Sequence, residues 1–302
     1  MSATHDPARP GGATLTAFAM ATVLGGGNFI GVRFSNRELD PLWGATLRFA
    51  LAALLFVTIV LVMRLRWPRG RVLLNTAVYG LLSFGLFYAL MYWALVRVTA
   101  GVATVVMAMV PLVTLLLAAA HGMERLGSRQ VAGAVLAVVG IGWISTGPDE
   151  LAIPPLALGA MILAIVCVGE SVILGKKVSA NHPAMTNAVA MATGAVVLAT
   201  MSAVAGDRWI LPQQPEVRWA VGYLVTLGSV GLFVLILLVV RTWSASATSY
   251  MFVLFPIVTM LLGAAAGDER LTVRGVTGAL VVMAGVWFGA LAPRATPAVE
   301  PA

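Results

Sequence analysis

Ten apolar runs of about twenty residues follow one another along the chain, separated by short segments that carry charges, glycine and proline. A helix rises about 1.5 Å per residue, so about twenty apolar residues cross the hydrocarbon core of a bilayer. Only 10% of the 302 residues are charged and 60% are apolar, which excludes a water-soluble fold. We therefore predict an all-α integral membrane protein with ten transmembrane helices, near residues 13–32, 42–63, 72–96, 98–120, 130–147, 155–175, 184–206, 219–240, 243–266 and 275–292.

The basic residues are distributed unevenly between the two sides that these spans define. One side holds 11 of the 19 Lys and Arg residues together with both termini, the other side holds 7, and Arg48 lies inside a span. Because loops rich in Lys and Arg stay in the cytoplasm, we predict a multi-pass protein of the inner (plasma) membrane with cytoplasmic N- and C-termini. The net charge of +7 is then explained by the excess of basic residues in the loops between the spans. The expected partners are the lipid bilayer and a small-molecule substrate, with no nucleic acid, and the expected state is a monomer.

The chain contains two similar halves. Residues 111–141 can be laid on residues 256–286 without a gap, and about half of these positions are identical. We therefore predict two five-helix repeats, residues 1–147 and 148–302. Because five is an odd number, the second repeat must cross the membrane in the opposite orientation. Inverted repeats of this kind surround a cavity near the membrane midplane and permit alternating access to it.

Three segments resemble a known family. They are PLWGATLRFALAAL from residue 41, with Arg48 inside it, ALVRVTAGVATVVMAMVPLVTLLL from residue 94, and Glu124-Arg125-Leu126. Together with the repeat, they are similar to the EamA-type branch of the drug/metabolite transporter superfamily over essentially the whole chain. Among its members, the chain resembles the bacterial exporters of aromatic and neutral amino acids. The resemblance implies a ten-helix carrier with a central cavity that exports small metabolites without ATP or a cofactor.

Arg48 and Glu170 are the two charged residues within the predicted spans, and the amide of Asn28 lies inside the first of these spans. A charge at such depth costs roughly 3 kcal/mol unless it finds a partner or water, so Arg48 is expected to face the protein interior. It could bind a substrate carboxylate with its forked donors or clamp backbone carbonyls at a helix end. Asn28 lies at similar depth. Glu170 lies in the cytoplasmic half of its span, where it could exchange protons, bind substrate, or simply reach the headgroups or Lys176 and Lys177.

The third span carries aromatic and methionine side chains at three- and four-residue spacing, which places Phe84, Tyr88, Met91 and Tyr92 on one stripe. Tyrosines on an internal stripe could stack on an aromatic solute and offer hydroxyl groups to its polar end. The alternative is a stripe packed against other helices or lipid. Trp143 could line the cavity too, although tryptophan near a span end often marks the membrane interface.

Pro111 and Pro256 occupy equivalent positions in the middle of the fourth and ninth spans. Each removes one backbone hydrogen bond and favours a kink, so both are predicted to serve as bending points of a gate.

Other functional classes fit the sequence less well. An enzyme would need a cluster of acid, base or metal-ligating side chains, yet His5, His121 and His182 lie in tails or loops and Glu170 stands alone within its span. Cys167 is the single cysteine, which excludes a disulfide framework and a cysteine metal cluster. We therefore predict a transporter and no enzymatic activity. A multidrug or cationic-compound exporter and a passive facilitator of small metabolites remain as alternatives within transport.

Overall fold

The computed structural model describes residues 11–124, 126–145, 153–178, 181–242, 245–267 and 269–291. Helices account for all of the regular structure in this part of the chain, and it contains no strand. In chain order they are α1 (Gly12–Ser35), α2 (Pro41–Val62), α3 (Gly70–Gly80), η1 (Leu81–Leu86), α4 (Phe87–Ala94), α5 (Ala100–Met107), α6 (Val110–Ala120), α7 (Ser128–Ser145), α8 (Pro155–Val178), α9 (Pro183–Ala205), α10 (Pro215–Val225), η2 (Thr226–Gly231), α11 (Leu232–Thr242), α12 (Ala245–Ala265), α13 (Val273–Val286) and η3 (Trp287–Leu291).

These helices lie where the apolar runs predict the spans. Nine helical stretches of the described residues are long and apolar enough to cross a membrane, and α12 contributes a shorter apolar stretch, Tyr250–Ala265. Proline stands at the first turn of α2, α9 and α10, where its missing N–H needs no helical partner. Large apolar side chains such as Leu54, Val62 and Val138 are exposed on the outside of the bundle, where lipid would cover them.

Two spans contain a π-helical segment at equivalent positions. The third span runs through α3, η1 and α4, and the eighth runs through α10, η2 and α11. Ser83 in η1 and Ser229 in η2 are the matched serines of the pentapeptides SFGLF and SVGLF. A π-helical turn interrupts the normal ladder of backbone hydrogen bonds, and such segments are frequent at functional sites.

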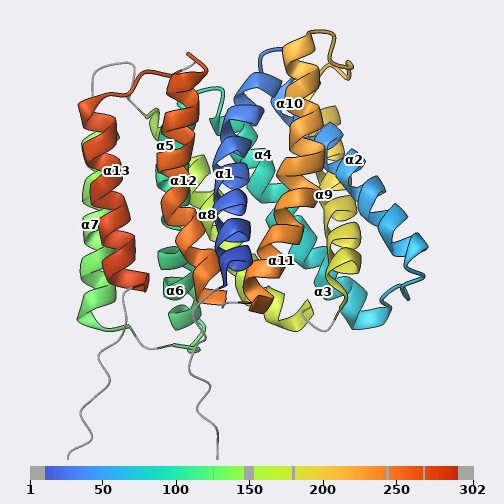
Figure 1. The fold of residues 1–302 in the computed structure, drawn as a ribbon, viewed down its shortest axis with the longest axis horizontal. Coiled ribbons are helices and arrows are strands. Elements are labelled where there is room, and N and C mark those ends of the chain that lie inside the picture. The colour runs from blue at the N-terminus through green and yellow to red at the C-terminus, as the bar shows by residue number, and fades with distance from the viewer. Residues whose placement is uncertain are drawn as a thin grey trace, which may run out of the picture.

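Equivalent helices of the two halves pack against each other. The second spans, α2 and α9, lie side by side at one edge of the bundle, and the fifth spans, α7 and α13, pair at the opposite edge (Figure 1). Between these edges, α1 packs on α12, and α8 packs on α6. The α7–α13 contact is close because glycines face each other: a Cβ on Gly133 would lie 2.6 Å from the carbonyl oxygen of Gly285.

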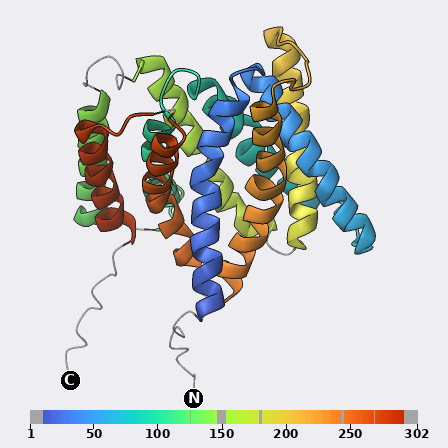
Figure 2. The same cartoon turned by 45° about the horizontal axis from the view of Figure 1, so that its top comes forward.

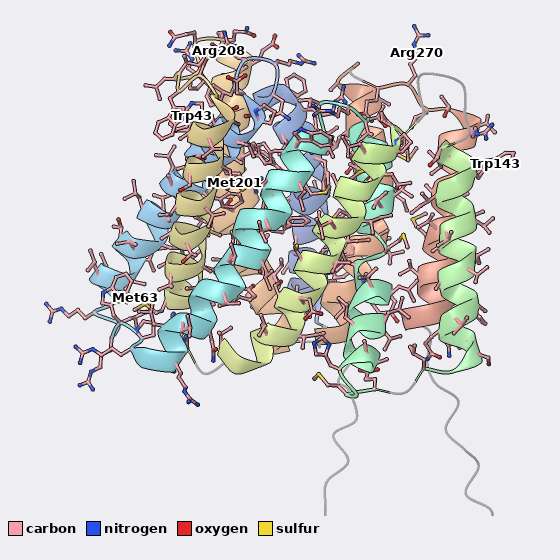
Figure 3. The ribbon with its side chains drawn as sticks, turned by 180° about the vertical axis from the view of Figure 1, so that it is seen from behind. Trp43, Met63, Trp143, Met201, Arg208 and Arg270 are labelled. Atoms are coloured by element: carbon pink, nitrogen blue, oxygen red, sulfur yellow. The ribbon has the colours of Figure 1, made fainter. Side chains whose placement is uncertain are left out.

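Both ends of the described helical chain lie at the same end of the bundle. The beginning of α1 and the end of η3 point the same way in Figure 2. Met63, which precedes the Arg64–Arg71 basic loop, lies at that end in Figure 3, whereas Trp43, Arg208 and Arg270 lie at the other. The positive-inside rule assigns the Met63 end to the cytoplasm. The opposite end is called the outer end below.

Candidate functional site

A cavity of about 300 Å³ lies among the helices of both halves. Its walls come from α1, α2, the third span and α5 in the first half, and from α8, α11 and α12 in the second. Most of the lining is apolar. Six of the eight residues proposed from the sequence as cavity residues line it: Asn28, Arg48, Phe84, Tyr88, Met91 and Tyr92.

Arg48 is held by the π-helical segment of the other half. Its side chain is 1% exposed; Nη2 donates to the carbonyl oxygen of Gly228 at 3.1 Å, and Nε donates to Oγ of Ser229 at 3.2 Å. The Ser229 hydroxyl in turn donates to the carbonyl oxygen of Leu224 at 2.8 Å. One interpretation of the sequence was that Arg48 binds backbone carbonyl groups at the end of a helix. Arg48 does bind a backbone carbonyl group, but that group belongs to Gly228 within the π-helical segment η2.

One guanidinium nitrogen of Arg48 makes no hydrogen bond within the described structure. Its Nη1 is buried and has no hydrogen-bond partner among the described residues. Arginine presents five N–H donors in a fixed plane, so the clamp on Gly228 and Ser229 leaves the Nη1 donors for a ligand or water. The guanidinium carbon also lies 5.2 Å from the centre of the Tyr88 ring. Arg48 can therefore both join the two halves and face the cavity.

Asn28 binds the same carbonyl group from α1. Its Nδ2 donates to the oxygen of Gly228 at 3.0 Å, and its Oδ1 is buried without a partner in the described structure. Gly228 must stay small, since a Cβ there would lie 2.1 Å from Asn28 Oδ1. Arg48 and Asn28 thus converge on one backbone group and leave a free donor and a free acceptor beside it.

The aromatic stripe of the third span forms one wall of the cavity. The rings of Phe84 and Tyr88 are stacked with centroids 6.2 Å apart, and Phe49 packs edge-on against Tyr88 at 4.4 Å. The hydroxyl groups of Tyr92 and Ser83 are both buried and make no well-aligned hydrogen bond among the described residues, although the Tyr92 hydroxyl lies close to the guanidinium group of Arg48. The stripe is therefore internal, and it brings polar atoms to an otherwise apolar wall.

The second half supplies aromatic residues that were not predicted from the sequence. Phe252 and Phe255 of α12 line the cavity and pack on each other at 5.4 Å, and Phe233 of α11 lies 5.7 Å from Phe84. Their position next to Pro256, in the helix equivalent to α5 and α6, is the one sequence signal that points to them.

Two proposed cavity residues lie elsewhere. Trp143 is 51% exposed; its Nε1 donates to Oγ1 of Thr277 at 3.2 Å, and the guanidinium group of Arg274 lies 4.4 Å from its ring centre. It sits at the edge of the bundle (Figure 3). Glu170 is 28% exposed and pairs with His121, with 3.8 Å between Oε2 and Nε2. Neither Trp143 nor Glu170 is therefore among the described residues that line this cavity, and the exposed position of Trp143 agrees with the alternative of an interfacial tryptophan.

The matched prolines differ in their surroundings. Pro111 stands in the first turn of α6, after a break at residues 108 and 109 that separates α5 from α6 beside the cavity residue Met107. Pro256 lies inside the continuous helix α12, next to the cavity residue Phe255. Both prolines therefore adjoin the cavity, and the fourth span is broken at its proline.

Contacts between the two halves lie at the outer end of the bundle. The carboxylate of Glu38 accepts hydrogen bonds from the backbone N–H groups of Gln213 and Gln214 at 2.8 and 3.0 Å. Nearby, Trp43 and Trp209 stack with ring centres 4.8 Å apart. The cavity lining runs from Val32 in the outer half of α1 to Val172 in the cytoplasmic half of α8.

The bundle of apolar helices and its internal cavity define a multi-pass membrane transporter. The model of the EamA-like transporter family matches twice, over residues 12–146 and 155–290, and the chain belongs to this family. It is similar to the Escherichia coli K12 protein named "Uncharacterized inner membrane transporter YedA", with 31% identity over 257 residues, which are 84% of this chain and 83% of that protein. The chain is a multi-pass protein of the inner membrane.

Other relatives carry similar names. An "Uncharacterized transporter" of Archaeoglobus fulgidus is 27% identical over 281 residues, which cover 89% of this chain and 96% of that protein. A solved crystal structure with 17% identity superposes with a TM-score of 0.64 and covers 92% of this chain and 96% of its own. That likeness supports the fold. The names of the relatives favour transport over catalysis.

Proposed function

We propose that this protein is a secondary transporter that exports aromatic and neutral amino acids across the inner membrane by alternating access. The mechanism requires two inverted five-helix repeats, residues 1–147 and 148–302. Two observations support them: the family model matches once in each half, and α1–α12 and α8–α6 are equivalent contacts in the two halves. An inverted repeat can build two equivalent gates around one central cavity.

The single observation that carries the substrate assignment is the set of unpartnered polar atoms in the aromatic cavity. Nη1 of Arg48 and the hydroxyl of Tyr92 can donate to a carboxylate, while Oδ1 of Asn28 can accept from an ammonium group. The rings of Phe84 and Tyr88 provide an apolar wall for a side chain. A volume of about 300 Å³ is at the small end of the range for ligand pockets, which suits a metabolite of this size.

A cationic drug would find less favourable chemistry here. Among the described residues, those that line the cavity include Arg48 and no carboxylate, and Glu170 lies outside that lining. A buried guanidinium group repels a cation that has no carboxylate of its own. The aromatic faces alone could attract a cation, but they would have to offset this repulsion.

The experiment that tests this proposal is a binding series with purified protein in detergent. A ligand that binds the folded state raises the midpoint of thermal unfolding. We expect L-phenylalanine to raise it more than phenylethylamine, which lacks the carboxylate, or 3-phenylpropionate, which lacks the ammonium group. Tyr92→Phe should reduce the difference between phenylalanine and phenylethylamine. A larger shift with tetraphenylphosphonium than with any amino acid would contradict the assignment and favour a cation exporter.

A further inference from the structure

The cavity contains a buried hydroxyl group that the packing of the protein does not use. Ser83 lies in η1, lines the cavity and is 7% exposed, and its Oγ makes no well-aligned hydrogen bond among the described residues. The hydroxyl group of Tyr79, which also lines the cavity, lies close to it. Leaving a buried hydroxyl group unpaired costs free energy, so such a group beside a cavity is a candidate contact for a ligand.

The two hydroxyl groups keep hydrogen-bonding capacity even when one donates to the other. Each hydroxyl group has one O–H donor and two acceptor lone pairs, so a bonded pair still offers one donor and several lone pairs to a ligand. Ser83 and Tyr79 therefore form a neutral polar site in a largely apolar lining, which is called the hydroxyl pair below.

The matched serine of the other half has its hydrogen bonds satisfied. Ser229 in η2 accepts from Nε of Arg48 at 3.2 Å and donates to the carbonyl oxygen of Leu224 at 2.8 Å. The alignment that lays Pro41 on Pro183 also lays Arg48 on Ala190 of α9, the helix that packs on η1. Because α9 has alanine at this position, it offers no equivalent guanidinium group to Ser83. The matched segments η1 and η2 thus give the cavity a neutral hydroxyl pair and a cationic group.

The aromatic wall of the cavity separates the hydroxyl pair from Arg48. The guanidinium carbon of Arg48 lies 5.2 Å from the centre of the Tyr88 ring, which stacks on Phe84 with ring centres 6.2 Å apart. On the other side of Phe84, the ring of Tyr79 lies 6.4 Å away. A solute ring that packs on Tyr88 and Phe84 with its carboxylate at Arg48 therefore directs the opposite edge of the ring toward the hydroxyl pair.

We propose that Ser83 and Tyr79 form a subsite that binds the phenolic hydroxyl group of a tyrosine substrate, so that the carrier prefers tyrosine to phenylalanine. This inference rests on the amino-acid export proposed above and narrows its substrate class. A phenolic hydroxyl group both donates and accepts, as the hydroxyl pair does. Phenylalanine would leave the buried Ser83 hydroxyl unpaired, and a site that hydrogen-bonds a substrate hydroxyl discriminates against the analogue that lacks it.

The test is a set of binding titrations with the purified protein in detergent. The ligands are L-tyrosine, L-phenylalanine and 4-methyl-L-phenylalanine, whose methyl group replaces the phenolic hydroxyl but makes no hydrogen bond. Ser83→Ala and Tyr79→Phe each remove one hydroxyl group of the pair. Ser171→Ala is the matched control, because the buried Ser171 hydroxyl donates to the carbonyl oxygen of Val168 at 2.7 Å in its own helix and lies outside the cavity lining.

We expect the unmodified protein to bind tyrosine about tenfold more tightly than phenylalanine or its 4-methyl derivative, because only tyrosine pairs with the buried hydroxyl group. Ser83→Ala should bring the affinities for tyrosine and phenylalanine to within about twofold of each other. Tyr79→Phe should reduce the preference, and Ser171→Ala should keep it. The preference is a ratio measured on one preparation, so a smaller fraction of folded protein does not change it.

Equal affinities for tyrosine and phenylalanine in the unmodified protein, or a full preference in Ser83→Ala, would overturn the subsite. A full preference in Tyr79→Phe would overturn the role of Tyr79. Binding of the 4-methyl derivative as tightly as tyrosine would assign the preference to the shape of the ligand and would also overturn the subsite. Loss of the preference in Ser171→Ala would do the same, since it would show that the effect comes from general packing.

Tyramine and phenylethylamine, which lack the carboxylate, separate the subsite from the proposed function. A Ser83-dependent preference for tyramine over phenylethylamine, without binding of amino acids, would retain the subsite and reject the proposed substrate class. Binding of phenylalanine without a preference for tyrosine would do the reverse. Absence of binding by all five ligands would overturn both.

Discussion

Arg48 combines a structural contact with an unused donor. Nε and Nη2 bind Ser229 and Gly228, and Nη1 is the donor that we propose for a substrate carboxylate. On that proposal, the two roles account for a residue whose burial is costly in the second span. They also mean that removing the side chain affects both the contact between halves and the binding of a carboxylate.

The carboxylate role can be separated from the contact by comparing two variants. We predict that Arg48→Ala lowers the affinity for phenylalanine about tenfold or more but lowers that for phenylethylamine much less, because only phenylalanine offers a carboxylate to Nη1. Ser229→Ala removes one partner of the contact and leaves Nη1 in place, so it should weaken both ligands to a similar extent. Binding titrations measure both. Equal losses for both ligands in Arg48→Ala would assign Arg48 to the contact alone.

Glu170 stands 13 residues before Pro183, as Asn28 stands 13 residues before Pro41, but the two side chains have different settings. Glu170 pairs with His121 of the first half and is partly exposed in the cytoplasmic part of α8. Since it lies outside the cavity lining, we predict that Glu170→Gln leaves amino-acid exchange within about twofold. If Glu170 couples transport to protons, the same change abolishes export driven by a pH gradient, because the amide cannot release a proton. Proteoliposomes with and without an imposed gradient measure the two activities. Unchanged gradient-driven export by a stably expressed variant would remove Glu170 from proton coupling.

At the scale of elements, η2 holds the two sides of the site together. Its Gly228 carbonyl accepts from Asn28 of α1 and Arg48 of α2, and no side chain larger than hydrogen fits at Gly228. We predict that Gly228→Ala lowers the free energy of unfolding by about 1 to 3 kcal/mol, as overpacking of a tight contact does. Gly222→Ala in the same span is the matched control, since nothing lies within 4 Å of its added Cβ. Equal unfolding midpoints in the two variants would show that α1 and η2 move apart freely.

The sequence predicted the spans well because length and apolarity alone define a membrane helix. It could not reveal η1 and η2, since a π-helical turn changes the hydrogen bonding without interrupting the apolar run. The Gly228 clamp was therefore not foreseen, although Arg48 and Asn28 were both expected in the site. Phe252 and Phe255 were missed for a related reason: nothing in an apolar run tells which ring faces the cavity. For the same reason the sequence left open whether Trp143, in the fifth span, faces the cavity or the membrane interface; its exposed ring lies next to Arg274.

At the scale of the whole molecule, the packing places one cavity between two halves that contact each other through equivalent helices. Polar contacts such as those of Glu38 with the backbone N–H groups of Gln213 and Gln214 join the two halves at the outer end. The cavity lining runs from Val32 in the outer half of α1 to Val172 in the cytoplasmic half of α8. The alternating-access mechanism that we propose requires contacts between the halves to open and close at the two ends in turn.

The measurement that tests this account most directly is counterflow in proteoliposomes that contain the purified protein. Vesicles are loaded with unlabelled phenylalanine and diluted into a trace of labelled phenylalanine. A carrier that alternates between two sides predicts a transient accumulation of label above its external concentration, and the Arg48→Ala protein should lose most of it. Equilibration of the label without accumulation, or no uptake of any amino acid in a panel that also includes cationic dyes, would contradict the proposed carrier and its substrate.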